Sequence, residues 1–231
     1  MKIKATILAL AFSIPLFSCG GQLKSGGNVK LTSLKDSVAY SIGVSIGTNL
    51  KRDGLDSINL DVLKAAMAAV LNGDSLQLAQ QECQGVIQTY LSQKQKSQGD
   101  KNLADGKKFL EENKKKQGVK TTASGLQYLV LKDSSGTVPK PTDTVKVHYH
   151  GTLIDGTVFD SSVERGEPVE FPVGQVIKGW TEALQLMHVG AKYRLFIPPD
   201  LAYGDRQAGQ KIGPNSTLIF DVDLLEVNGK K

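Results

Sequence analysis

The apolar residues of this 231-residue chain change their period near residue 120, which limits the folds that the chain can adopt. Before that point they recur every three or four positions, as in helices. After Thr121, short alternating runs follow at residues 126–131, 145–149, 193–197 and 218–227, with turn sequences such as Asp155-Gly156 between them. A single short helix fits at residues 181–187. The pattern predicts an α+β protein: an all-helical N-terminal domain followed by an antiparallel sheet with one helix.

The first predicted helix has one apolar face. Large aliphatic residues recur every four positions, at Leu34, Val38, Ile42, Ile46 and Leu50. Ser33 and Asp36 have the spacing of a capping box, so the helix should begin between them, and Asp53-Gly54 should end it. Gly43 and Gly47 share a face and would let a second helix approach closely.

Two further helical regions follow. Residues 59–71 should form a helix that ends at Gly73, and a third region runs from about residue 75 to about 117, where Gly99 and Gly106 could interrupt it. Residues 92–102 contain no large apolar side chain, so this stretch should not bury a core face. We expect residues 92–118 to be either a helical arm that spans solvent or a linker.

Charge is uneven along the chain. Residues 1–118 hold 16 basic and 10 acidic residues, whereas residues 119–231 hold 12 and 13. Many of the surplus lysines fall on one predicted helical stretch, without interleaved aromatic residues and without a nucleic-acid motif. A solvated helix face explains them better than a nucleic-acid surface, so no nucleic-acid partner is predicted.

The N-terminus has the features of a bacterial lipoprotein signal. Lys2 and Lys4 precede an apolar run too short to span a bilayer, and residues 16–19, LFSC, resemble the lipobox in which the cysteine is lipidated. Residues 1–18 are therefore predicted as a signal peptide, Cys19 as the lipidation site, and residues 19–29 as a flexible tether. Gly20, in place of aspartate, favours the outer membrane, with the periplasmic or the surface face left open. An ordinary secretory signal with a chance cysteine is the alternative.

The remaining cysteine and the histidines favour structural roles. With Cys19 lipidated, Cys83 has no intramolecular partner, and we expect a buried free thiol rather than an intermolecular disulfide. His148 and His150 alternate with Tyr149 and should be solvated on the opposite face. A metal there would need a third ligand, and His188 is the only other histidine. No metal and no cofactor are predicted.

Large apolar residues of the second half gather at strand ends, at turns and at the helix start: Tyr149, Phe159, Val176, Ile177, Trp180, Tyr203, Ile212 and Phe220. Taken alone, such a cluster is more often core than binding site. The motifs around it are VHYHG, DGTVFDSS, VIKGWTEAL, PDLAYG and IGPNSTLIFDVDLLEV. In order and spacing they resemble the FKBP-type peptidyl-prolyl cis-trans isomerases over residues 121–228. The resemblance implies a five-stranded antiparallel sheet wrapped on a short helix, within an isomerase domain at residues 119–231.

The resemblance also implies roles for single residues. Trp180 would form the pocket floor, Tyr149, Phe159 and Phe220 its walls, and Val176 and Ile177 part of its rim, with Ile212 beside them. Asp160, Arg165 and Tyr203 would supply polar groups, and Phe159, Asp160 and Tyr203 would take part in catalysis. Substrates would be proline-containing unfolded or exported polypeptides, and macrolide inhibitors are possible ligands.

Such a pocket suits the chemistry of an X–Pro bond. The barrier to rotation arises from amide resonance, and the twisted amide has less charge separation than the planar one. A dry aromatic pocket therefore favours the twisted state relative to water, without a nucleophile or metal. The Ile177 N–H could hold the substrate carbonyl. Asp160 could either polarise the twisted amide or orient Arg165 and Tyr203.

The helical half resembles the domain that precedes the isomerase module in Mip-like proteins. The stretches DSVAYSIGVSIGTNLKRDGLD and LDVLKAAMAAVLNG carry this resemblance. It implies that residues 30–91 form a homodimerisation domain joined to the isomerase by a long helix. The predicted function is a prolyl isomerase that assists the folding of exported proteins. The alternative is a holdase-type chaperone or adhesion factor with weak isomerase activity.

The lipobox makes a testable prediction. Cys19→Ala should abolish acylation and either release the protein in soluble form or leave its signal peptide uncleaved, because firm anchoring needs more than one acyl chain and Cys19 is the predicted attachment residue. Cell fractionation and mass spectrometry of the mature N-terminus measure both effects. An unmodified Cys19 in soluble wild-type protein would contradict the assignment.

Overall fold

The structure, a computed structural model, describes residues 29–228. It divides into two units, Met1–Ile58 and Asn59–Lys231. The predicted signal peptide and Cys19 lie outside the described residues, as does the predicted tether except for Val29. No helix within residues 29–228 is long and apolar enough to cross a membrane.

The first unit contributes helix α1, Leu34–Arg52, with the predicted boundaries. The Ser33 side chain accepts from the Asp36 N–H, and the Asp36 carboxylate accepts from the Ser33 N–H, which forms the expected capping box. No residue of α1 is buried, and Leu34 is 81% and Ile42 51% exposed. A Cβ added at Gly43 or Gly47 would meet nothing within 4 Å. The predicted apolar face is therefore uncovered within the described chain.

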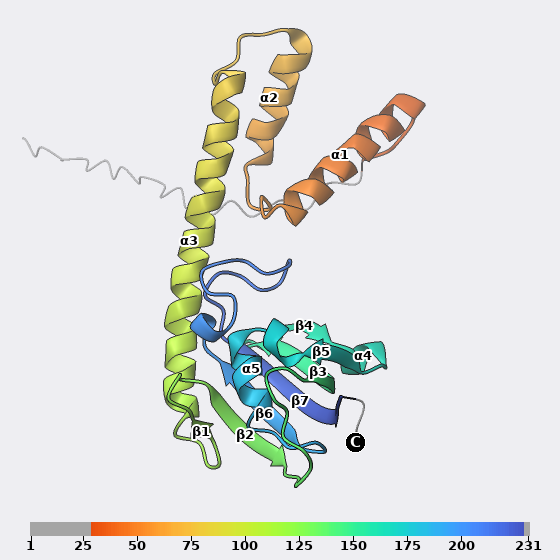
Figure 1. Cartoon of the computed structure of the whole chain (residues 1–231). Coiled ribbons are helices and arrows are strands. Elements are labelled where there is room, and N and C mark those ends of the chain that lie inside the picture. The colour runs from red at the N-terminus through yellow and green to blue at the C-terminus, as the bar shows by residue number, and fades with distance from the viewer. Residues whose placement is uncertain (1–28, 229–231) are drawn as a thin grey trace, which may run out of the picture. The chain divides into compact units, whose positions relative to one another are not determined.

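The second unit begins with two helices, α2 at Leu60–Asn72 and α3 at Gln80–Asn113 (Figure 1). Asn59 caps α2 at its start, and Gly73 ends it in the left-handed conformation with φ of 76°. Helix α3 is continuous, without a break at Gly99 or Gly106. The boundary predicted between residues 91 and 92 thus falls inside one helix.

Two expectations for α3 were wrong. Cys83 is only partly buried, because the helix face around it is open within the described residues, and its thiol donates to the Ala79 carbonyl at 3.5 Å. The polar stretch does not simply span solvent, because Gly99 is buried and the Asn102 side chain donates to the Pro214 carbonyl at 2.8 Å. Small and amide side chains make this contact without any large apolar residue.

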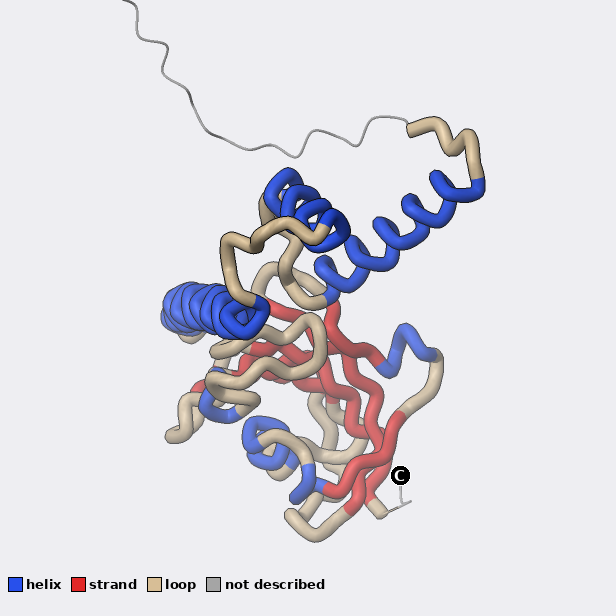
Figure 2. Tube along the Cα trace, turned by 90° about the horizontal axis from the view of Figure 1, so that it is seen from above, coloured by secondary structure: helices blue, strands red, loops and turns tan. Residues whose placement is uncertain are grey.

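The remainder is an antiparallel sheet, as predicted. Its strands are β1 (Lys120–Thr121), β2 (Gln127–Lys132), β3 (Thr144–Leu153), β4 (Val158–Ser161), β5 (Val169–Pro172), β6 (Lys192–Ile197) and β7 (Leu218–Val227). The order is β1-β2-β6-β7-β3-β4, and β5 also pairs with β3. Figure 2 shows these strands running side by side in one curved layer.

Within the described residues the sheet has seven strands rather than the expected five. One reason is the length of β3: residues 144–147 pair with β5, and residues 150–152 pair with β4. Two short strands thus share one edge of a long one. The two-residue strand β1 adds a further partner to β2.

The core lies between the sheet and helix α5, Lys178–Leu184. Along β3 and β7 every second side chain is buried, which is the pattern of a sheet with one covered face. Leu184 from α5 and Leu195 and Leu224 from the sheet are almost fully buried, each contributing about 2 kcal/mol. A Cβ at Gly179 would lie 2.5 Å from Ile197 Cγ2, so glycine is what lets α5 approach β6.

The shorter elements surround this core. Helix α4 spans Ser162–Arg165, and 3₁₀ turns lie at Val173–Gln175 and Pro199–Leu201. The histidines of β3 are half-buried rather than solvated, since His148 Nδ1 lies 3.1 Å from Ser162 Oγ and His150 Nδ1 lies 3.0 Å from Ser161 Oγ. Both serines belong to the segment that turns from β4 into α4. Among the described residues no group of three or more His, Cys, Asp or Glu side chains could hold a metal ion.

Candidate functional site

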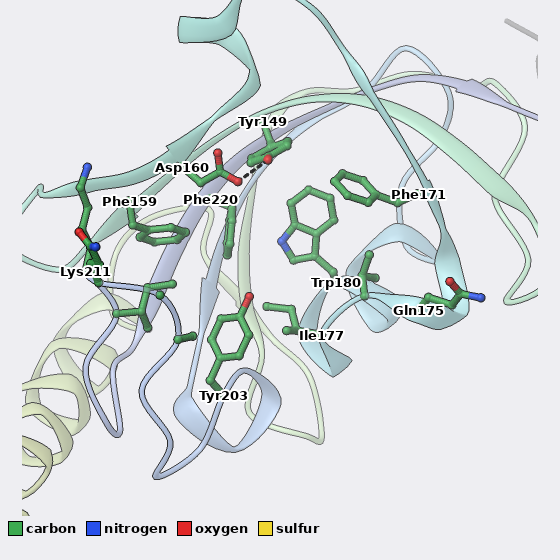
Figure 3. Close-up of a pocket in the computed structure, with 15 residues that line it drawn as sticks. Tyr149, Phe159, Asp160, Phe171, Gln175, Ile177, Trp180, Tyr203, Lys211 and Phe220 are labelled. Carbon is green, nitrogen blue, oxygen red and sulfur yellow. Dashed lines mark hydrogen bonds between the residues drawn. The ribbon is translucent and has the colours of Figure 1, made fainter. Parts of the chain in front are cut away.

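A cavity of about 690 Å³ opens between helix α5, strands β3, β4, β5 and β7, and the loop before β7. It is mostly apolar. The residues that line it, drawn in Figure 3, are Tyr149, Phe159, Asp160, Phe171, Gln175, Val176, Ile177, Trp180, Tyr203, Ala208, Gly209, Gln210, Lys211, Ile212 and Phe220.

Trp180 forms the floor of the cavity. It is the third residue of α5, is 4% exposed, and meets three rings nearly at right angles. The ring centroids of Tyr149, Phe171 and Phe220 lie 5.5, 5.8 and 5.2 Å from it. Edge-to-face pairs of this kind are favourable beyond the area they bury. The indole N–H is buried and makes no hydrogen bond to any residue within 29–228, and Figure 3 shows it turned toward the space between Phe220 and Tyr203.

A glycine in β3 makes room for the opposite wall. Gly151 lies opposite Asp160 of β4 and Phe220 of β7 in the strand registers. A Cβ there would lie 2.7 Å from the Phe159 ring and 2.9 Å from the Phe220 ring. The two phenyl rings pack edge to face with centroids 5.3 Å apart. Gly151 therefore allows both rings to lie over the strand.

Three polar groups form a hydrogen-bonded set at the edge of the cavity. The Tyr149 hydroxyl donates to Asp160 Oδ2 at 2.5 Å, and Arg165 donates to Asp160 Oδ1. Arg165 also donates to the Tyr149 hydroxyl at 2.9 Å. Each carboxylate oxygen thus has its own donor, and the Asp160 side chain is held in one orientation beside the aromatic wall.

These contacts shift the pKa values of the set. Burial raises the pKa of Asp160, but donation from Tyr149 and Arg165 outweighs it, and the net pKa lies below the ordinary value. The pKa of Tyr149 is raised, first by burial and then by its bond to Asp160. The pKa of Arg165 is raised by its bonds to Tyr149 and Asp160. At neutral pH the set is an ionised carboxylate, a neutral phenol and a guanidinium cation.

The rim carries the remaining polar groups. Ile177 precedes α5, and its backbone N–H donates no hydrogen bond to any residue within 29–228. Tyr203 follows the 3₁₀ turn at Pro199–Leu201, and Figure 3 shows its hydroxyl pointing into the cavity. The far wall is a loop in which Ala208 and Ile212 exchange backbone hydrogen bonds, and Lys211 Nζ donates to the Val158 carbonyl at 2.6 Å.

The structure brings the predicted site residues together with one exception. Arg165 does not line the cavity, but lies behind Asp160 and Tyr149. Asp160 bonds to Arg165 and Tyr149, and no hydrogen bond joins it to Tyr203 within the described residues. Sequence reasoning missed Phe171, Gln175 and the loop residues Gly209 and Gln210. Phe171 was detectable as a half-buried strand residue, because Val169 and Phe171 alternate with the exposed Glu170 and Pro172.

The arrangement can hold a compact apolar group beside an amide. The lining includes no Cys, Ser or His that could serve as a nucleophile. It offers rings, an oriented carboxylate, a phenol and an unpaired backbone N–H. Such a surface can bind a peptide through apolar contacts and a few directed hydrogen bonds.

Comparisons with known proteins show the family to which the chain belongs. Residues 136–225 match the family model described as FKBP-type peptidyl-prolyl cis-trans isomerase, and residues 35–130 match that of the domain amino terminal to it. The outer membrane protein MIP of Legionella longbeachae is 43% identical over 237 residues, covering 98% of each chain. The chain belongs to the FKBP-type peptidyl-prolyl cis-trans isomerase family.

Other relatives agree with this assignment. The 22 kDa FKBP-type isomerase of Escherichia coli is 46% identical over 84% of this chain and 96% of its own. The crystal structure of FkpA from Escherichia coli superposes with a TM-score of 0.68 at 39% identity, covering 86% of this chain and 98% of that one. The expected family, fold and enzyme class are confirmed. All the lining residues fall inside the matched isomerase module.

The polar set predicts a pH effect. Tyr149→Phe should raise the pKa of Asp160 toward its ordinary value, because the hydroxyl no longer stabilises the ionised carboxylate. A lowered folded-state pKa means that the stabilisation from this carboxylate is present above its unfolded-state pKa and is lost as the pH falls through the folded-state pKa. NMR titration of the side-chain carboxyl carbon measures the shift.

Tyr193→Phe is the matched control. Its hydroxyl donates to the Leu186 carbonyl at 3.1 Å, away from the cavity, so its loss should leave Asp160 unchanged. An Asp160 pKa that does not rise in the Tyr149 variant would contradict the assigned hydrogen bonds.

Proposed function

We propose that this isomerase accelerates X–Pro rotation by seating the proline ring on Trp180 and stabilising the twisted amide in the aromatic cavity. The observation that carries the proposal is the floor itself, an almost fully buried indole among three edge-on rings that opens to a cavity of about 690 Å³. A proline ring is compact and apolar and would exclude water from this surface.

In this proposal, removal of the X–Pro amide from water is the main source of the rate acceleration. An uncatalysed X–Pro bond isomerises over tens to hundreds of seconds, because rotation must break amide resonance at a cost of about 18–20 kcal/mol. Water stabilises the polar planar amide more than the twisted one. In a cavity lined by Tyr149, Phe159 and Phe220 the planar amide loses this extra stabilisation by water. The barrier to rotation is therefore lower, because the cavity favours the twisted transition state over the planar ground state.

Two polar groups would position the substrate. The free Ile177 N–H at the rim can donate to a substrate carbonyl, which would otherwise lose its hydrogen bond on leaving water. The hydrogen bonds that Tyr149 and Arg165 donate stabilise the negative charge of Asp160 and orient its carboxylate at the wall. In this proposal it polarises the twisted amide and keeps Tyr149 in place, whereas Tyr203 acts independently from the opposite side.

The site predicts two variants with reduced activity. Phe159→Ala and Asp160→Ala should each lower kcat/KM on a short X–Pro peptide about tenfold, which corresponds to about 1.4 kcal/mol of lost transition-state stabilisation. Protease-coupled or NMR exchange rates on the peptide measure this, with circular dichroism as a check on folding.

Glu167→Ala is the control, because Glu167 is exposed and lies outside the cavity. Wild-type rates in both site variants would refute the assignment. Two assays separate isomerase activity from the alternative holdase activity. Acceleration of a refolding reaction that is limited by proline isomerisation reports the isomerase, and suppressed aggregation of a client protein without proline reports the holdase.

We also propose that the protein works in the cell envelope on exported, unfolded, proline-containing polypeptides. The support is the lipobox-like sequence at Cys19 together with the similarity to a relative named as an outer membrane protein. In this proposal Cys19 anchors the chain to the outer membrane. The same apolar cavity would admit macrolide inhibitors, which present a ring and neighbouring carbonyls to it.

Residues 30–91 form a homodimer in this proposal. Helix α1 buries none of its residues in the described chain, and Leu34, Val38 and Ile42 lie along an apolar groove on one of its faces. A continuous apolar face of this kind is unfavourable in water, and a symmetric pair is the commonest way to cover it. Open space around Gly43 and Gly47 supports a close helix crossing.

The dimer makes a hydrodynamic prediction. The chain truncated to residues 28–231 should sediment as a dimer, and residues 119–231 should be a monomer that still isomerises short peptides. Ile42→Glu should dissociate the dimer or unfold the helical half, because a charge would enter the apolar contact. Thr48→Glu, on another face of α1, is the control. Sedimentation equilibrium at micromolar concentration decides it, and a monomeric 28–231 chain would refute the proposal.

A further inference from the structure

One face of helix α3 carries two glycines, two asparagines and one phenylalanine that lie against the isomerase module. The residues occur at alternating intervals of three and four, which keeps them in line on a helix. They are Gly99, Asn102, Gly106, Phe109 and Asn113, called here the docking stripe. Gly99, Gly106 and Asn113 are buried, although the stretch is polar in sequence.

The two ends of the docking stripe hold different parts of the module. At the C-terminal end, the Phe109 ring lies 5.9 Å from that of Phe196, and Asn113 Nδ2 donates to Gln127 Oε1 at 3.0 Å. These contacts tie α3 to strands β6 and β2. At the N-terminal end, Gly99, Asn102 and Gly106 instead meet residues 213–217, just before β7.

At this end of the docking stripe, α3 can lie close to residues 214–217 because Gly99 and Gly106 have no side chain. A Cβ at Gly106 would lie 2.3 Å from Thr217 Oγ1, and one at Gly99 would lie 3.2 Å from Pro214 Cβ. The first contact is too short for any real Cβ atom. The hydroxyl of Thr217 is itself buried and makes no hydrogen bond within the described residues.

Asn102 provides the directional contact. Its Nδ2 donates to the Pro214 carbonyl at 2.8 Å and lies 3.3 Å from Ser216 Oγ. Its Oδ1 accepts from Gln98 Nε2 at 2.7 Å, which orients the amide. A weaker contact runs the other way, from Asn215 Nδ2 to the Gly99 carbonyl at 3.4 Å.

The segment held by Asn102 is the base of the loop that walls the cavity. This pocket loop, residues 204–217, follows Tyr203 and carries Ala208–Ile212 at the cavity. Its two ends meet where the Asn215 N–H donates to the Gly204 carbonyl at 2.8 Å. Pro214, the residue that accepts from Asn102, is two positions after Ile212. A helix outside the cavity thus contacts the loop within one or two residues of its lining.

We propose that helix α3 positions the pocket loop, with Asn102 as the positioning residue, so that the helix joining the two halves of the chain sets how firmly the cavity holds its polypeptide. The proposal rests on the proposed function of the cavity. Ordering a loop of this length costs conformational entropy, which the contacts from α3 offset before substrate arrives. Without them, the substrate must order the loop itself.

The first experiment alters Asn102 in the full chain. Asn102→Ala removes the amide, and Asn102→Asp keeps its size but loses the donor and sets a carboxylate against the Pro214 carbonyl. Both should speed hydrogen exchange at residues 204–217 and lower kcat/KM on an X–Pro peptide about three- to tenfold, through KM more than kcat. Gln95→Ala and Gln95→Glu are matched controls at an exposed position of the same helix and should behave as wild type.

The second experiment tests the close approach by rescue. Gly106→Ala should loosen the pocket loop, because its Cβ would overlap Thr217 Oγ1, although alanine favours the helix itself. Thr217→Ala removes that oxygen, which has no hydrogen bond to lose within residues 29–228, and leaves the Thr217 Cβ 3.3 Å from the new methyl group, so that a shift of about a few tenths of an ångström accommodates it. The double variant should therefore recover slow exchange and wild-type KM. A general loss of helix stability would not be recovered in this way.

Trp180 gives a readout that does not depend on catalysis. It is the single tryptophan of the chain, so acrylamide quenching of its fluorescence reports the covering of the cavity. Increased quenching in the Asn102 variants and in Gly106→Ala supports the proposal. Wild-type exchange, quenching and KM in those variants would overturn it. If the wild-type protein lacks isomerase activity, the proposed function fails, while exchange and quenching still decide whether α3 positions the loop.

Discussion

The edge-on packing of Trp180 against Tyr149, Phe171 and Phe220 is the contact on which the core and the cavity both depend. Helix α5 brings the indole to the sheet because Gly179, one residue earlier, lets its backbone approach Ile197. The same ring closes the hydrophobic core on one side and forms the cavity floor on the other. In the proposed function, stability and ligand binding therefore share one side chain, and a change there would affect both.

The aromatic site is held in place by polar groups that do not themselves face the substrate. Arg165 lies behind the wall, where its bonds to Asp160 and Tyr149 fix a carboxylate and a phenol at defined positions. Asn102 lies on a helix outside the isomerase fold, where it holds the base of the pocket loop. In both cases a directional hydrogen bond orders a group that apolar packing alone would leave free to move.

Local patterns in the sequence were enough for much of the architecture. The capping box at Ser33, the stop at Gly73 and the alternation along β7 act between near neighbours, and the structure agrees with each. Motif order was also enough to collect the rings of the cavity, except Phe171, from distant parts of the chain. The strand count was wrong because pairing is non-local: only the fold reveals that β4 and β5 divide one edge of β3.

The sequence by itself determined the helical and strand halves, the family, and most of the aromatic lining, because these follow from periodicity and from motifs. The tertiary structure decided which groups meet across the chain. It placed Phe171 at the cavity and Arg165 outside its lining. It also brought Asn102 into hydrogen-bond contact with the Pro214 carbonyl, which the polar sequence around Asn102 does not indicate. The reason is physical: a hydrogen bond or a close glycine contact between residues about 110 positions apart leaves no local pattern, since each partner taken alone is compatible with solvent.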